Sequence, residues 1–190
     1  MSLYRACVEL TLERLRLFEA QGDVCVDPPS AIPRVRQWLG DRWAYQGQRG
    51  HDLGERLAYA TATAFSGGAQ RVVVIGTDSP WLSDQDILAA FSAVDRSDVV
   101  IGPTDDGGYY LIGLSRPLPA LFSAVSWSTR SVLRQTRSNA RALGVRVELL
   151  RYGYDLDHPS DVERFIEEQR RHRIDAKWIT RFVLVNQRRP

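Results

Sequence analysis

An uninterrupted apolar run at residues 72–75 restricts the folds open to this chain more than any other feature. A strand that is apolar on both faces is typical of the centre of a parallel sheet that helices cover on each side. Further strands, predicted at residues 99–101 and 145–150, are separated from it by helical patterns, one of which begins at the N-capping residue Ser83. This alternation predicts an α/β fold with a mostly parallel central sheet and helices on both faces.

The length of the chain fits one domain of this kind. Its 190 residues, of which 44% are hydrophobic and 25% charged, have the composition of an ordinary globular protein. A domain of this size buries about 70% of the surface that its unfolded chain exposes. We therefore expect residues 1–190 to form a single domain.

Composition also excludes several classes of function. The net charge of +2 provides no argument for a nucleic-acid partner or an anionic membrane, and no apolar run approaches the ~18 residues that span a bilayer. The first residues lack the pattern of a signal peptide. Cys7 and Cys25 are too few for a disulfide framework and lie in apolar stretches, which predicts buried thiols. The sequence thus predicts a cytoplasmic protein without nucleic-acid or membrane partners.

Aspartates follow three of the predicted strands. Ligands of open α/β sheets bind at the carboxyl ends of the strands, so these carboxylates are expected to converge on one site. A carboxylate at the end of a buried strand is costly to leave unpaired, and a hard divalent cation is one partner that can bind it. Each aspartate alone is also compatible with a turn or a helix cap. The candidates are Asp78 after residues 72–75, Asp105 and Asp106 after residues 99–101, and Asp155 and Asp157 after residues 145–150.

Four other residues are candidates for substrate contacts. Gly107 and Gly108 follow the aspartate pair and allow a close approach of the backbone to a ligand. Trp127 either stacks on a sugar ring or belongs to the core. Arg56, on the first turn of a predicted helix, either meets a phosphate or is a solvated surface residue.

Five segments, taken together, are similar to a known family. They resemble bacterial GT-A-type transferases of the group called radical-SAM/selenodomain-associated transferase 1, or arsenosugar-biosynthesis-type glycosyltransferase. The resemblance covers about residues 3–165 and implies a Rossmann-like nucleotide-diphospho-sugar transferase fold. The segments are GHDLGERL (50–57), VVVIGTDSPWL (72–82), DVVIGPTDDGGYYLIGL (98–114), VSWSTRSVL (125–133) and YDLDHPSDV (154–162).

The resemblance also implies roles for individual residues. Asp78 falls on the position of a metal and diphosphate contact, with Asp157 in the later Asp-x-Asp pair as a second metal or substrate contact. Asp106, beside Asp105, falls in a segment that is expected to bind the acceptor or to supply the general base. Gly54 lies in a segment that is expected to bind substrate. The implied cofactor is a divalent metal, Mg²⁺ or Mn²⁺.

The expected function is therefore metal-dependent transfer of a sugar from a nucleotide-diphospho-sugar to an unknown acceptor. A metal held by carboxylates neutralises a leaving diphosphate, and a second carboxylate deprotonates an attacking hydroxyl. Two alternatives stay open. One is a nucleotidyltransferase that acts on a small molecule, and the other is a nucleotide-binding or interaction module without catalysis.

The sequence departs from the family at both ends. The family begins with an apolar strand and a basic Lys-Thr-Arg loop that should cradle the nucleotide, whereas this sequence starts at the following helix. Residues 166–190 are an extra segment, and their apolar run at 181–185 resembles the absent strand, with residues 186–190 as the start of its basic loop. We expect this run to fill the central strand position, either in its own chain or exchanged within a homodimer. The alternative is a disordered tail or a peripheral helix.

Overall fold

Helices and strands alternate along most of the chain, and all seven strands belong to one sheet. The computed structural model describes residues 3–156, 159–171 and 182–187. The helices are α1 (Leu3–Arg14), α2 (Ile32–Leu39), α3 (Leu53–Ser66), α4 (Asp84–Val94), α5 (Val132–Ala142) and α6 (Pro159–Arg171), with short 3₁₀ segments η1 (Arg16–Gln21), η2 (Pro29–Ala31) and η3 (Pro119–Phe122). The strands are β1 (Gly22–Val26), β2 (Ala44–Gly47), β3 (Arg71–Gly76), β4 (Val99–Pro103), β5 (Tyr109–Leu114), β6 (Val147–Leu149) and β7 (Phe182–Gln187).

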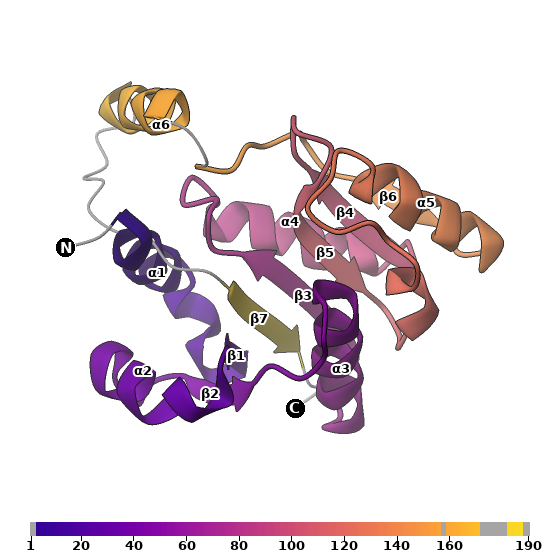
Figure 1. Ribbon diagram of the computed structural model, residues 1–190, viewed down its shortest axis with the longest axis horizontal. Helices are drawn as coiled ribbons and strands as arrows, with labels where there is room; N and C mark the ends of the chain where they lie inside the picture. The colour runs from indigo at the N-terminus through magenta and orange to yellow at the C-terminus, as the bar shows by residue number, and fades with distance from the viewer. Residues whose placement is uncertain (1–2, 157–158, 172–181, 188–190) are drawn as a thin grey trace.

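The order of the strands in the sheet is β2-β1-β7-β3-β5-β4-β6 (Figure 1). Strands β1, β2, β3, β4 and β6 run in one direction, and β5 and β7 run against them. The prediction of an α/β fold is confirmed, but the sheet is more mixed than expected. The physical reason for β5 is the tight turn at residues 104–108, because a turn this short can join only antiparallel strands.

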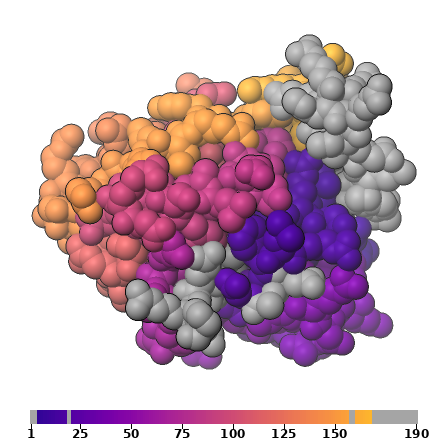
Figure 2. All heavy atoms as spheres, turned by 180° about the vertical axis from the view of Figure 1, so that it is seen from behind, coloured from indigo at the N-terminus to yellow at the C-terminus, as the bar shows by residue number. Residues whose placement is uncertain are grey.

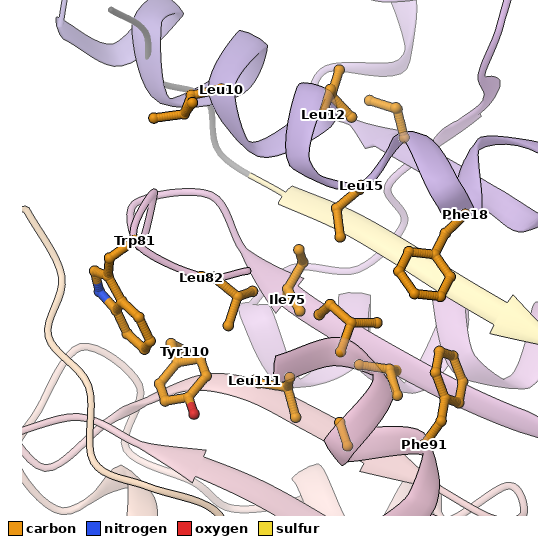
Figure 3. Packing of buried hydrophobic residues seen from close by; sticks show 14 of the residues in the cluster. Leu10, Leu12, Leu15, Phe18, Ile75, Trp81, Leu82, Phe91, Tyr110 and Leu111 are labelled. Atoms are coloured by element: carbon orange, nitrogen blue, oxygen red, sulfur yellow. The ribbon is translucent and has the colours of Figure 1, made fainter. Parts of the chain in front are cut away.

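Strand β3 occupies the middle of the molecule, and its side chains alternate between two apolar cores. Val73 and Ile75 pack in the core under α1 and α4, where Phe18 and Phe91 meet with ring centroids 6.2 Å apart (Figure 3). Val72 and Val74 pack in the core on the other face, under α3 and α5. The view from behind shows the indigo N-terminal helix beside the magenta segment of α4 (Figure 2). The predicted helices on both faces are confirmed.

Strand β7, which the chain reaches last, lies between β1 and β3. Its residues pair antiparallel with both neighbours, with Val183 opposite Ile75 and Val185 opposite Gly22. The C-terminal apolar run thus forms a central strand within its own chain, which is the first of the alternatives that the sequence left open. A strand that leads into a nucleotide-binding loop would end at the same edge of the sheet as β3, but β7 runs in the opposite direction. Gln187 lies opposite Arg71, so the chain leaves β7 at the amino end of β3, away from Asp78.

Further expectations concern the two cysteines, membrane-spanning helices, the cellular location and the oligomeric state. Cys7 and Cys25 are free and buried, as predicted. No helix in the part of the chain that the structure describes is long and apolar enough to cross a membrane. The cytoplasmic location and the homodimer stay predictions.

Close packing between β4 and β5 leads to a testable expectation. A Cβ at Gly102 would lie 2.3 Å from Cζ of Tyr110, well inside van der Waals contact. We expect Gly102→Ala to lower the free energy of unfolding by about 1–3 kcal/mol, since the ring must move in a packed core. Urea denaturation measures the change. Ser138→Ala, at an exposed position of α5, is the control and should stay within about 0.5 kcal/mol. Equal stability of the two variants would contradict the packing.

Candidate functional site

A cavity of about 610 Å³ opens at the edge of the sheet where β1 and β3 end. This volume lies within the ~300–1,000 Å³ that is typical of small-molecule sites. The end of β1 contributes Val26, and Asp27 follows it directly; β3 contributes Gly76, and the start of β5 contributes Tyr109 and Tyr110. The cavity is therefore located where ligands of open α/β sheets bind.

Three carboxylates line this cavity, those of Asp27, Asp78 and Asp155, and the last two lie on segments that are hydrogen-bonded to each other. Asp78 follows β3 and Asp155 follows β6, and both line the cavity. Hydrogen bonds join the segments that carry them. The Ser79 hydroxyl donates to Oδ1 of Asp155 at 2.6 Å, and the backbone N–H of Leu156 donates to the carbonyl oxygen of Asp78 at 2.9 Å. Two of the three acidic strand ends thus meet, although their residues are 77 positions apart in the sequence.

The start of helix α3 also contributes to the cavity wall. Asp52 caps it by accepting a hydrogen bond from the N–H of Glu55 at 2.8 Å. Arg56, one turn into the helix, lines the cavity, and its guanidinium pairs with Asp27 at 2.9 Å and donates to the carbonyl of Gly50 at 3.2 Å. Arg56 is therefore held at the cavity wall by an ion pair, and an anionic ligand there would compete with Asp27 for it.

The Asp-Asp-Gly-Gly turn is held by contacts within itself and with several neighbouring segments. Oδ1 of Asp106 accepts hydrogen bonds from the Thr104 hydroxyl at 2.5 Å and from the N–H of Gly108 at 3.0 Å. Gly107 has a φ of +92°, and a Cβ there would lie 2.4 Å from the carbonyl oxygen of Arg130. Only glycine fits that place.

Neither carboxylate of this turn belongs to the cavity wall as far as the described residues define it. The Asp105 carboxylate lies 3.6 Å from the guanidinium of Arg164 on α6. Ser128, in the loop that packs on the turn, does line the cavity. One cleft shared by Asp78 and Asp106 stays a prediction.

Trp127 and Gly54 pack against each other. A Cβ at Gly54 would lie 2.7 Å from the indole nitrogen of Trp127 and 2.6 Å from the carbonyl oxygen of Phe122. The Trp127 ring meets the Tyr109 ring edge-on at 6.3 Å and packs on the core between α3 and α5. The structure therefore gives both residues a packing role, which was one of the two interpretations of Trp127.

The donor set of a metal site is partly defined. Among the residues that the structure describes, no group of three or more His, Cys, Asp or Glu side chains comes together. Asp78 and Asp155 supply two carboxylates, and Asp157, the other predicted ligand, lies outside the described residues.

Burial, with a contribution from the charge of Asp78, raises the pKa of Cys7, so this thiol stays protonated.

Comparison with known proteins places the chain in a family. Residues 11–129 match the model of DUF2064, described as an uncharacterized protein conserved in bacteria. The chain belongs to this family. A crystal structure from Desulfovibrio desulfuricans G20, provisionally named a nucleotide-diphospho-sugar transferase, superposes with a TM-score of 0.82 at 30% identity, over 88% of this chain and 74% of that chain. The predicted nucleotide-diphospho-sugar transferase fold is confirmed, and the radical-SAM-associated group stays a prediction.

A curated relative of this DUF2064 protein is also similar in sequence. It is the phosphoenolpyruvate guanylyltransferase of Chloroflexus aggregans (strain MD-66 / DSM 9485), with 28% identity over 153 residues. The match covers 77% of this chain and 71% of the relative.

Several residues of the cavity were not predicted as site residues. Tyr110 lines the cavity, and Ser79 donates a hydrogen bond to Asp155, which also lines it. From the sequence pattern alone, Tyr110 belongs to a strand and Ser79 to a turn. Asp27 directly follows the apolar end of β1, which is the same signal that identified Asp78. That signal was available in the sequence and would have found it.

Proposed function

We propose that this DUF2064 protein is a divalent-metal-dependent glycosyltransferase that takes its sugar from a nucleotide-diphospho-sugar. The observation that carries the proposal is the pair of carboxylates, Asp78 and Asp155, on the wall of a cavity at the carboxyl ends of β1 and β3. The fold that this chain shares with the Desulfovibrio protein supports it.

The carboxylate pair fits the metal that the fold family implies. Mg²⁺ takes oxygen ligands and is usually bound to nucleotides through one or two carboxylates plus phosphate oxygens, so a cage of protein ligands is not required. Asp78 and Asp155 would hold the ion, with Asp157 as a further ligand. When bound, the ion would neutralise the charge that develops on the leaving diphosphate.

The acceptor is proposed to bind near the Asp-Asp-Gly-Gly turn. Asp106 is the candidate general base, because a carboxylate within hydrogen-bond reach of an attacking hydroxyl can take its proton. Asp105 is the neighbouring candidate. Ser128 and Tyr109 connect this turn to the cavity, since both line it.

A second candidate function is nucleotidyl transfer to a small phosphorylated acceptor. The similarity to the Chloroflexus guanylyltransferase over 77% of the chain favours it. The same carboxylates would serve there, because pyrophosphate is also an anionic leaving group that a metal stabilises.

Product analysis separates the two reactions. We expect the protein, with Mn²⁺ and a panel of nucleotide-diphospho-sugars, to release a nucleoside diphosphate when mixed acceptors are supplied. Nucleotidyl transfer would instead consume a nucleoside triphosphate and release pyrophosphate. Chelation with EDTA is the control and should stop either reaction.

A thermal-shift series supplies the binding measurement, since a specific ligand at a hundred times its Kd stabilises the fold by about 2.7 kcal/mol. If no nucleotide or nucleotide sugar shifts the Tm, the proposal is wrong.

A further inference from the structure

Trp81 lies in the loop after β3 and contacts three other residues around the end of the sheet. Its indole N–H donates to the carbonyl oxygen of Tyr154 at 2.6 Å, and its ring stacks on the Tyr154 ring with centroids 5.7 Å apart. The Tyr110 ring meets it edge-on at 4.7 Å (Figure 3). The Arg151 guanidinium lies 4.5 Å above it. We call these four residues the Trp81 cluster.

Helix α4 anchors the Trp81 cluster through Arg151. The guanidinium donates two hydrogen bonds to the Asp86 carboxylate, at 2.8 and 2.9 Å. Burial alone would raise the pKa of Asp86, but hydrogen bonds from Arg151 and Ser83 hold it below its ordinary value. Asp86 is therefore ionised at neutral pH, and the two-point ion pair fixes Arg151 in a defined position.

The segment that carries Asp155 passes directly beneath the indole. A Cβ at Gly153 would lie 2.1 Å from Cζ2 of Trp81, so only glycine allows this approach. The N–H of Gly153 donates to the carbonyl oxygen of Pro103 at 2.8 Å, beside the end of β4. Residues 150–156 have little regular structure of their own, and these contacts help to hold them against the sheet.

Two residues further along, the same segment reaches the cavity. Oδ1 of Asp155 accepts the hydrogen bond from Ser79, whose side chain is 1% exposed. Ser79 and Trp81 thus act on the same short segment from one loop. Ser79 contacts the Asp155 carboxylate itself, and Trp81 contacts the backbone of the preceding residue.

We propose that Ser79 and Trp81 are positioning residues that hold the Asp155 carboxylate beside Asp78 on the cavity wall. The inference rests on the proposed function, because the affinity that it concerns is that of a divalent ion bound with a nucleotide. Groups that orient metal ligands typically change metal affinity about 10–100-fold when they are removed. Ser79 and Trp81 occupy that position relative to Asp155, and neither is needed as a ligand.

The test compares two variants with two matched controls. Ser79→Ala removes the hydroxyl, and Trp81→Phe keeps an aromatic ring but removes the donor to Tyr154. Ser97→Ala removes another serine that donates to a carboxylate, that of Glu148 at 3.2 Å. Trp43→Phe alters a tryptophan that is equally buried, in the same apolar core. Neither control residue lines the 610 Å³ cavity.

Mn²⁺ binding in the presence of UDP or GDP is measured by calorimetry, and urea unfolding is measured in parallel. We expect Ser79→Ala and Trp81→Phe to raise the Kd for Mn²⁺ about 10–100-fold, while Ser97→Ala and Trp43→Phe leave it within about twofold. If wild-type protein binds Mn²⁺ and all four variants bind it equally well, the positioning role is wrong while the proposed function stands. If wild-type protein binds no Mn²⁺ with either nucleotide, the metal part of the proposed function fails and the inference fails with it. Should Trp81→Phe not fold, Ser79→Ala alone decides.

Discussion

Replacing Asp78 by alanine will reduce metal-dependent nucleotide binding about 100-fold while the protein stays folded. The side chain lines the cavity directly after β3, where it would hold the ion against the phosphates. A bound cation supplies several kcal/mol of charge stabilisation, and each ~1.4 kcal/mol changes an equilibrium about tenfold. Asp78 is only partly buried, so its removal leaves no large hole in either core.

Nucleotide titrations with and without Mn²⁺ measure this effect. The matched control is Asp41→Ala, which removes a carboxylate that pairs with Arg36 at 3.6 Å and whose side chain is 82% exposed. Its affinity for the metal–nucleotide complex should equal that of wild-type protein. An Asp78→Ala variant with unchanged affinity in the presence of Mn²⁺ would rule out the metal role of this residue.

Deletion of residues 182–190 will prevent stable folding. Strand β7 lies between β1 and β3 and pairs with both, so its removal leaves two rows of backbone N–H and C=O groups without partners inside the sheet. Unpaired backbone groups that are cut off from water are costly and rare in folded proteins. Strands with unpaired edges also associate with other chains. We expect an insoluble product or one without a cooperative unfolding transition.

Deletion of residues 188–190 is the control for this truncation. It leaves the whole β7 ladder, from Phe182 opposite Gly76 to Gln187 opposite Arg71. The shorter deletion should therefore keep the far-UV circular dichroism spectrum and the Tm of wild-type protein within about 2 °C, because it removes none of the β7 pairs. A soluble longer deletion with a native-like cooperative transition would contradict the central place of β7.

Features that depend on neighbours in the sequence could be predicted from the sequence alone. Ser83 caps α4 together with Asp86, as its capping box indicates, and Asp52 caps α3. Gly144, a residue type that commonly ends helices, follows α5 with a φ of +66°. Each of these features is decided by hydrogen bonds across three or four residues. The apolar run at residues 72–75 likewise predicts a central strand, because both of its faces must be covered.

Features that join distant parts of the chain were decided only by the tertiary structure. The apolar run near residue 182 predicts a strand, but its antiparallel direction depends on β1 and β3, which precede it by more than 100 residues. The same holds for Arg56 beside Asp27, and for Ser79 beside Asp155. Local patterns describe which face of an element is apolar and where it begins. They contain no information on which side chains meet across the sheet, because those contacts exist only after the elements have packed.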